Sequence, residues 1–249
     1  MRARGCGMAE LGAEELQALI PQWQERFCDS TPSALLEFFL GKFGNRIALA
    51  SSMGPEDQML TDLIMGIDRS ARIFTIDTGR LYPETYNLID YTCEYYGCRI
   101  EVFSPDHAGV EAYVRQYGIN GFYLGVEQRR ACCQARKLEP LRRALSTLQA
   151  WICGLRREQG VTRSQEQRIE WDAQHGLLKL NPLVEMTQDE VWEYLRSHHV
   201  PYNQLHDRQN FPSIGCAPCT RAIRPGEDQR AGRWWWEDPQ HRECGLHRR

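Results

Sequence analysis

Two pairs of cysteines, Cys132 with Cys133 and Cys216 with Cys219, could bind a metal centre. Four thiolates from two separated segments can close a tetrahedral sulfur site, and sulfur-only ligation selects zinc or an iron–sulfur cluster over hard cations. Zinc sites usually have a Cys-x2-Cys or wider spacing in both halves, which only the second pair has. Adjacent cysteines point their sulfurs in different directions, so they suit a large centre or a bent backbone. The spacing favours an iron–sulfur cluster, with zinc as the alternative.

A further cysteine, Cys244, lies near the end of the chain, between Arg242 and His247. A thiolate is strongly nucleophilic and nearby cations lower its pKa, so Cys244 is a candidate nucleophile. The alternative is an exposed thiol without a role. The remaining five cysteines lack paired spacing and are interpreted as structural or incidental: Cys6, Cys28, Cys93, Cys98 and Cys153. A disulfide framework is not favoured in a chain of this length without an export signal.

Two polar loops follow expected strands. The first holds Ser51, Ser52 and Gly54 between a strand and a helix, where amides and hydroxyls can meet a phosphate. It lacks the Gly-Lys-Ser/Thr of a Walker A loop, so an ordinary turn remains the alternative. The second loop supplies a carboxylate for a ribose or base edge and an arginine for an anion, with the residues Asp77, Thr78, Gly79 and Arg80. The two loops together predict a nucleotide site.

Basic residues flank these motifs. Arg136 and Lys137 each lie four residues after one of the first two cysteines, one helical turn away. Such cations would offset the negative charge of a thiolate-bound cluster, whereas the alternative is a solvated basic face. Three arginines in expected loops, Arg163, Arg230 and Arg233, are each more often surface charge than ligand when taken singly.

The elements that position these residues alternate along the chain. Strands are expected near 46–52, 72–77, 99–103, 150–154 and 177–180, with helices near 10–27, 32–40, 55–67, 83–96, 108–117, 130–145 and 187–198. This order predicts an α/β fold with a doubly wound, mainly parallel sheet that binds ligands at the carboxyl ends of its strands. We expect residues 1–31 to form a helical cover, 32–200 a nucleotide-binding domain, and 201–249 an irregular tail packed on that domain.

Composition narrows the function. The 249 residues carry a formal charge of −3 with pI about 6.2, so the net charge of the whole molecule does not favour binding to nucleic acid. No apolar h-region follows the basic start, and no window approaches the roughly 18 apolar residues of a membrane helix. We therefore expect a cytoplasmic protein that binds neither membranes nor nucleic acid, with thiols kept reduced.

Taken together, these motifs resemble the assimilatory adenylyl-sulfate (APS) reductases of the bacterial iron–sulfur type, within the phosphoadenylyl-sulfate (PAPS) reductase family. The resemblance runs from about Pro32 to the end, because the nucleotide loops, both cysteine pairs, the segment 232–237 and the tail 243–247 occur in the family's order. It implies a fold related to the ATP pyrophosphatases and a [4Fe–4S] cluster on the four paired cysteines. Relatives without those cysteines use PAPS, so the resemblance favours APS as substrate.

The resemblance also implies roles for single residues. Cys244 would attack the sulfur of APS, expel AMP and become S-sulfonated, after which thioredoxin or glutaredoxin would release sulfite. The residues matching positions that face sulfate and phosphate are Lys137, Arg163, Arg230, Arg233 and His247; those matching the nucleotide loops are Ser51, Ser52, Gly54, Asp77, Thr78, Gly79 and Arg80. Met53 departs from the family's Ser-x-Ser-Gly loop, and the chain has no thioredoxin-like domain, so the reductant is expected to be a separate protein. Homo-oligomerisation is an expectation from the family.

Three other functions remain open. A PAPS reductase would perform the same chemistry on a substrate with an additional 3′-phosphate. A tRNA-thiolating enzyme also combines a nucleotide loop with paired cysteines, but it would favour a basic surface. A non-catalytic iron–sulfur sensor that binds a nucleotide would tolerate replacement of Cys244.

Overall fold

A computed structural model describes residues 11–159 and 163–238, and its centre is a six-stranded sheet in the order β3-β2-β1-β4-β6-β5. The strands are β1 (Ile47–Ser51), β2 (Arg72–Ile76), β3 (Ile100–Phe103), β4 (Ala150–Ile152), β5 (Ile169–Asp172) and β6 (Leu177–Leu180). Neighbouring strands are parallel except β5 and β6, which pair antiparallel. The predicted mainly parallel α/β sheet is therefore confirmed.

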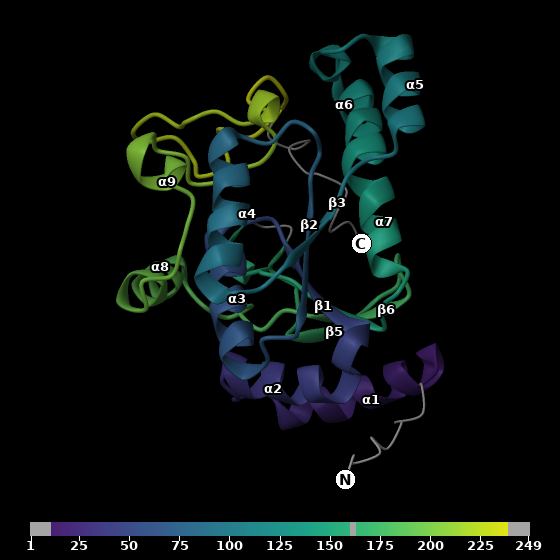
Figure 1. The fold of residues 1–249 in the computed structure, drawn as a ribbon, viewed down its shortest axis with the longest axis vertical. Helices are drawn as coiled ribbons and strands as arrows, with labels where there is room; N and C mark the ends of the chain where they lie inside the picture. Colours follow the sequence, from purple (N-terminus) through teal and green to yellow (C-terminus); the bar gives the residue numbers. More distant parts are fainter. Residues whose placement is uncertain (1–10, 160–162, 239–249) are drawn as a thin grey trace.

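Helices connect the strands and cover the sheet (Figure 1). They are α1 (Ala13–Arg26), α2 (Pro32–Phe43), α3 (Pro55–Ile67), α4 (Pro83–Tyr96), α5 (His107–Tyr117), α6 (Val126–Cys133), α7 (Glu139–Leu145), α8 (Gln188–Ser197) and α9 (Leu205–Arg208). Short 3-10 turns lie at 44–46, 121–123, 157–159 and 217–219. A π-helical turn, Gln134–Leu138, joins α6 to α7.

Local sequence signals explain several helix starts. The Thr31 hydroxyl accepts from the Ala34 N–H at 3.2 Å, and Pro32 follows as the first helical residue of α2. Thr187 and Glu190 form a reciprocal capping box at the start of α8. Prolines also open α3 and α4, where a missing N–H costs no helical hydrogen bond. These signals fix where the loops between strands and helices end.

Apolar side chains pack on both faces of the sheet. One core joins α1, α2, α3 and α8 to the inner side chains of β1, β4, β5 and β6. A second core lies between the other face and α7, around Trp151, Leu141 and Phe74. Figure 1 shows α1 and α2 at one end of the molecule and the green to yellow segment that follows α8 at the other. Among the described residues no helix is long and apolar enough to span a membrane.

Three elements differ from the sequence expectation, and the smallest is the four-residue helix α9 in the segment 201–249, which was expected to be irregular. The single basic helix expected near 130–145 is divided into α6, the π-helical turn and α7. Strand β5 was not expected; in its sequence Ile-Glu-Trp-Asp the charged residues alternate with apolar ones, and it pairs at the edge of the sheet. The division of the chain at residues 31 and 200 stays a prediction.

Candidate functional site

The larger of two neighbouring cavities lies at the carboxyl ends of the parallel strands and has a volume of about 280 Å³. Its wall includes Ser51 at the end of β1, Ile76 at the end of β2, and Cys153 directly after β4. This is the edge where ligands bind in open α/β sheets. The cavity also receives side chains from α7, α8 and the segment 206–234.

The loop from Ser51 to Gly54 uses its hydroxyls internally. The Ser52 N–H and hydroxyl both donate to the Asp57 carboxylate, at 2.6 and 2.7 Å. Ser51 Oγ accepts from the Met53 N–H at 3.1 Å and lies 3.4 Å from the Met53 sulfur. Met53 has a φ of 61° and is buried in the core, so its side chain points away from the cavity. The serines thus shape the loop through contacts that are already present.

Asp57 was not singled out in the sequence, although its carboxylate organises this loop from the first turn of α3. Burial raises its pKa from 3.8 to about 6, against the lowering effect of the Ser52 hydrogen bonds. The sequence did offer a signal for this role, because Asp57 lies in the first turn of the helix that follows the loop, where a carboxylate can accept hydrogen bonds from the loop.

The second loop divides its residues between two cavities. Thr78 lines the larger cavity, and its hydroxyl lies 3.2 Å from the Cys216 sulfur. Arg80 lines the smaller cavity and donates to the Ile119 carbonyl at 2.6 Å. Asp77 and Gly79 line neither cavity; the Asp77 carboxylate accepts from the Gly79 N–H and the Tyr86 hydroxyl, both at 2.7 Å. This loop therefore links the two cavities structurally.

Four cationic side chains identified in the sequence line the larger cavity: Lys137, Arg163, Arg230 and Arg233. Arg233 is 8% exposed, and its Nη1 donates to the Ser213 hydroxyl at 3.3 Å. Within the part of the chain that the structure describes, it forms no ion pair with a carboxylate. A buried cation in this setting favours an anionic ligand, because an unpaired buried charge is costly.

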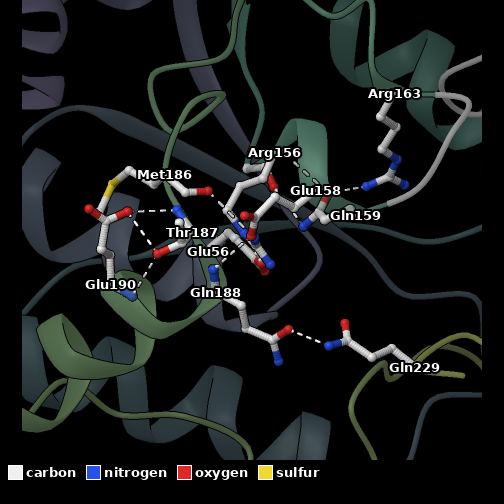
Figure 2. A network of polar contacts seen from close by, with 11 residues as sticks. Glu56, Arg156, Glu158, Gln159, Arg163, Met186, Thr187, Gln188, Glu190 and Gln229 are labelled. Atoms are coloured by element: carbon white, nitrogen blue, oxygen red, sulfur yellow. Dashed lines mark hydrogen bonds and ion pairs between the residues drawn. The ribbon is translucent and has the colours of Figure 1, made fainter.

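A polar network supports the wall that carries Arg163 (Figure 2). The side-chain oxygen of Gln159 accepts from Arg163 and from the Arg156 N–H. The buried Arg156 guanidinium donates to Glu56 at 2.8 Å and to Glu158 at 3.3 Å, which ties the loop after β4 to α3. None of Arg156, Gln159 and Glu56 was predicted as part of the site.

The same network reaches the segment that carries Arg230. The Gln188 N–H donates to Glu158 at 3.2 Å, and the Gln188 side-chain oxygen accepts from Gln229 at 2.6 Å. Figure 2 shows Gln188 and Gln229 pointing toward one another from α8 and the C-terminal segment. This bond connects the residue next to Arg230 to the sheet domain.

The smaller cavity is lined by all four paired cysteines, Cys132, Cys133, Cys216 and Cys219. The first pair ends α6, and the π-helical turn follows directly, so the backbone departs from α-helical geometry immediately after the adjacent cysteines. The second pair is held against the loop after β2: the Ala217 N–H donates to the Arg80 carbonyl at 2.8 Å, and the Tyr82 hydroxyl donates to the Thr220 carbonyl at 2.6 Å.

The chemistry of this lining suits a sulfur-ligated cluster. Four cations, Arg80, Arg129, Arg136 and Lys137, line the cavity with the cysteines and would offset the charge of bound thiolates. Burial raises the pKa of Cys132, and raises that of Cys219 to about 12, so these thiols stay protonated unless a cationic centre binds them. Within residues 11–159 and 163–238, no group of three or more His, Cys, Asp or Glu is arranged to hold a single metal ion, so the fit to a cluster rests on the residue types that line this cavity and not on a metal-binding geometry.

Lys137 lines both cavities. The sequence placed it one helical turn from Cys133, which predicted a position beside the cysteines. The structure shows that it also lines the larger cavity. Cys244 and His247 lie outside the described residues, so their predicted roles stay predictions.

Comparison with known proteins gives a consistent result. Residues 46–222 match the model of the phosphoadenosine phosphosulfate reductase domain. The chain is 55% identical over 203 residues to the adenosine 5′-phosphosulfate reductase of Allochromatium vinosum, covering 82% of this chain and 79% of that protein. It is 42% identical over 234 residues to the Pseudomonas aeruginosa protein of the same name, covering 92% and 86%.

Solved structures show the same fold at lower sequence identity. The PAPS reductase of Candida auris superposes with a TM-score of 0.70 at 22% identity, covering 85% of this chain and 98% of that one. The FMN adenylyltransferase of Candida glabrata, in complex with FAD and pyrophosphate, gives 0.53 at 16% identity, covering 87% and 74%.

Proposed function

The chain belongs to the phosphoadenosine phosphosulfate reductase family, and from this premise we propose that it reduces adenosine 5′-phosphosulfate to sulfite and AMP. The observation that carries the proposal is the cationic wall of the larger cavity, formed by Lys137, Arg163, Arg230 and the buried Arg233. A phosphosulfate is an anion that such a wall would bind. The names of the similar proteins support APS as the substrate.

The reaction begins with the Cys244 thiolate as nucleophile. Its sulfur forms a bond to the sulfur of APS while the bond from that sulfur to the phosphate oxygen breaks, which leaves an S-sulfocysteine and releases AMP. Negative charge develops on the leaving phosphate oxygen, and the cations of the larger cavity stabilise it. His247 is proposed to contact the same anionic groups.

An external dithiol completes the turnover. One thiolate of thioredoxin or glutaredoxin attacks the Cys244 sulfur, sulfite leaves, and the second thiol resolves the mixed disulfide. The dithiol is oxidised to a disulfide as the transferred sulfur goes from the sulfate to the sulfite level, so two electrons balance. The reducing cytoplasm would keep all these thiols reduced, and we expect the chain to form a homo-oligomer.

The four paired cysteines would hold a [4Fe–4S] cluster. When bound, such a group supplies fixed charge and rigidity beside the substrate. Lys137 faces both cavities and would orient the sulfate relative to that charge, while Arg136, whose Nη1 donates to the Thr78 carbonyl at 2.8 Å, holds the nucleotide loop beside the cysteines. These roles belong to the chain's own residues.

The test is the peptide mass of anaerobically purified protein mixed with APS or with PAPS, without any dithiol. We expect a sulfonate on the Cys244 peptide from APS, and no adduct in Cys244→Ser with its iron retained. An adduct from PAPS alone would keep the covalent step and replace the substrate. No adduct from either, or sulfite production by Cys244→Ser, would refute the reductase mechanism and favour a sensor or an RNA-modifying enzyme.

A further inference from the structure

Trp234 lies in the wall between the two cavities. It is 1% exposed, lines the larger cavity, and packs in one apolar cluster with Cys132 and Cys219 of the smaller cavity. Its backbone N–H donates to the Cys219 carbonyl at 3.0 Å. The residue is therefore fixed to the segment that carries one cysteine pair while its side chain forms part of the other cavity.

The Trp234 ring contacts one guanidinium from each cavity. The Arg129 carbon Cζ lies 4.8 Å from the ring centroid, and the Arg233 Cζ lies at the same distance. Arg129 lines the cysteine cavity, and Arg233 lines the larger one. Cation–π contacts of this kind strengthen when they are removed from water, as they are here.

The two arginines differ in how they are held. Arg129 donates twice to the Glu237 carboxylate, at 3.0 and 2.8 Å, in a buried ion pair, and it also interacts with the Cys133 side chain. Arg233 donates to the Ser213 hydroxyl, contacts the Trp234 ring, and lies so close to Gly215 that an added β-carbon there would be 2.5 Å from its Nη2. Trp234 is thus the aromatic surface among the contacts that hold the Arg233 guanidinium in place.

The Trp234 backbone is strained. Its φ of 42° lies in the left-handed region, which an L-residue with a large side chain rarely adopts. The conformation persists because the Cys219 and Glu237 contacts on either side fix the chain. Such strain is retained where the position of one side chain matters for function.

We propose that Trp234 is a positioning residue: it holds Arg233 toward the substrate in the larger cavity and links the position of Arg233 to Arg129 beside the cysteines. The inference rests on the proposed function, because it takes the larger cavity as the site of the adenylyl-sulfate and its product AMP. Trp234 acts through Arg233 and needs no contact of its own with the substrate.

The first test compares Trp234→Phe with Trp234→Leu by calorimetric titration with AMP and by iron content. We expect Trp234→Leu to bind AMP about tenfold more weakly, the order of one desolvated cation–π contact, and Trp234→Phe to stay within about threefold of the unsubstituted protein. Both should retain iron.

The matched control is Trp23→Leu. Trp23 lies on α1, is 4% exposed, and has the Lys42 ammonium 5.5 Å from its ring centroid. It should bind AMP normally.

The second test leaves Trp234 intact. Arg129→Lys keeps the charge and a partner for Glu237 but loses the planar contact with the ring, so we expect AMP to bind about threefold more weakly although Arg129 lies in the other cavity. Normal AMP binding by Arg129→Lys would refute the link. Normal binding by Trp234→Leu, or equal losses in the Phe and Leu variants, would refute the positioning role. Failure of the unsubstituted protein to bind AMP would instead refute the proposed function.

Discussion

The two cavities are built in different ways. The walls of the larger one are held by hydrogen bonds within the protein: Asp57 holds the first loop, Gln159 holds Arg163, and Gln188 holds Gln229. The smaller one is lined by four thiols and four cations. The larger cavity therefore has its shape before a ligand binds. In the smaller cavity, the four thiols are sulfur donors that need a bound group to ligate. Four experiments would test or refine this contrast.

The largest effect is expected at the cysteine cavity. Cys219→Ser removes one of four sulfur donors, so iron content should fall to below about a tenth of that of the unsubstituted protein. Cys153→Ser is the matched control, because Cys153 is also buried but lines the larger cavity. Iron and acid-labile sulfide assays on both variants would decide; equal iron content would contradict the assignment of the smaller cavity as the cluster site.

Gly215→Ala should displace Arg233 without changing any charge. A β-carbon at residue 215 would lie 2.5 Å from the Arg233 Nη2, closer than real atoms approach. We expect the KM for APS to rise about 10- to 100-fold, the order of lost charge-assisted hydrogen bonds. In the control, Gly41→Ala, an added β-carbon meets nothing within 4 Å. An unchanged KM in Gly215→Ala would mean that Arg233 does not contact the substrate.

Asp57 should make stability depend on pH. Its folded pKa of about 6 lies above the ordinary 3.8, so the stability it contributes is fully present below pH 3.8 and is lost as the pH rises through about 6. The full loss is about 3 kcal/mol, of which about 1 kcal/mol falls between pH 5 and 7.5. Urea unfolding at these two pH values should show that difference against Asp57→Asn. A gap between the two proteins that does not change with pH would show that Asp57 keeps an ordinary pKa.

The smallest effect is expected for the Gln188–Gln229 bond. Either glutamine changed to alanine should weaken AMP binding about threefold, and the double variant should lose no more than a single one, because both remove the same bond. Calorimetry on the three variants measures this coupling. Strictly additive losses would show that the two side chains act separately.

Much of the fold could be predicted because buried strands and capped helices leave local signals. The apolar run of β1 and the capping box of α8 are examples. Strand β5 gave a weaker signal, since half of its four residues are charged and it lies at an edge. The π-helical turn has no local signal that separates it from an α-helix.

For the site, sequence spacing identified the cysteines and the cations but not their arrangement. All four paired cysteines line one cavity, whereas Arg80, expected near the nucleotide, lines the cysteine cavity instead of the larger one. The sequence alone did not indicate which of the consecutive residues Trp234, Trp235 and Trp236 is part of the site, because they differ in burial: Trp234 is 1% exposed and Trp235 is 36% exposed. Burial depends on contacts with Arg129 and Cys219, which are distant in the chain.

The π-helical turn from Gln134 to Leu138 changes the direction in which the side chains after it leave an otherwise regular helix. Relative to an α-helix, a turn of this kind holds one extra residue, which rotates everything after it by about 100° around the helix axis. Lys137 lies inside this turn and reaches both cavities. Its direction is therefore set by the winding of the main chain, so deletion of Gln134 would turn the lysine away while leaving its charge and its direct neighbours, Arg136 and Leu138, intact.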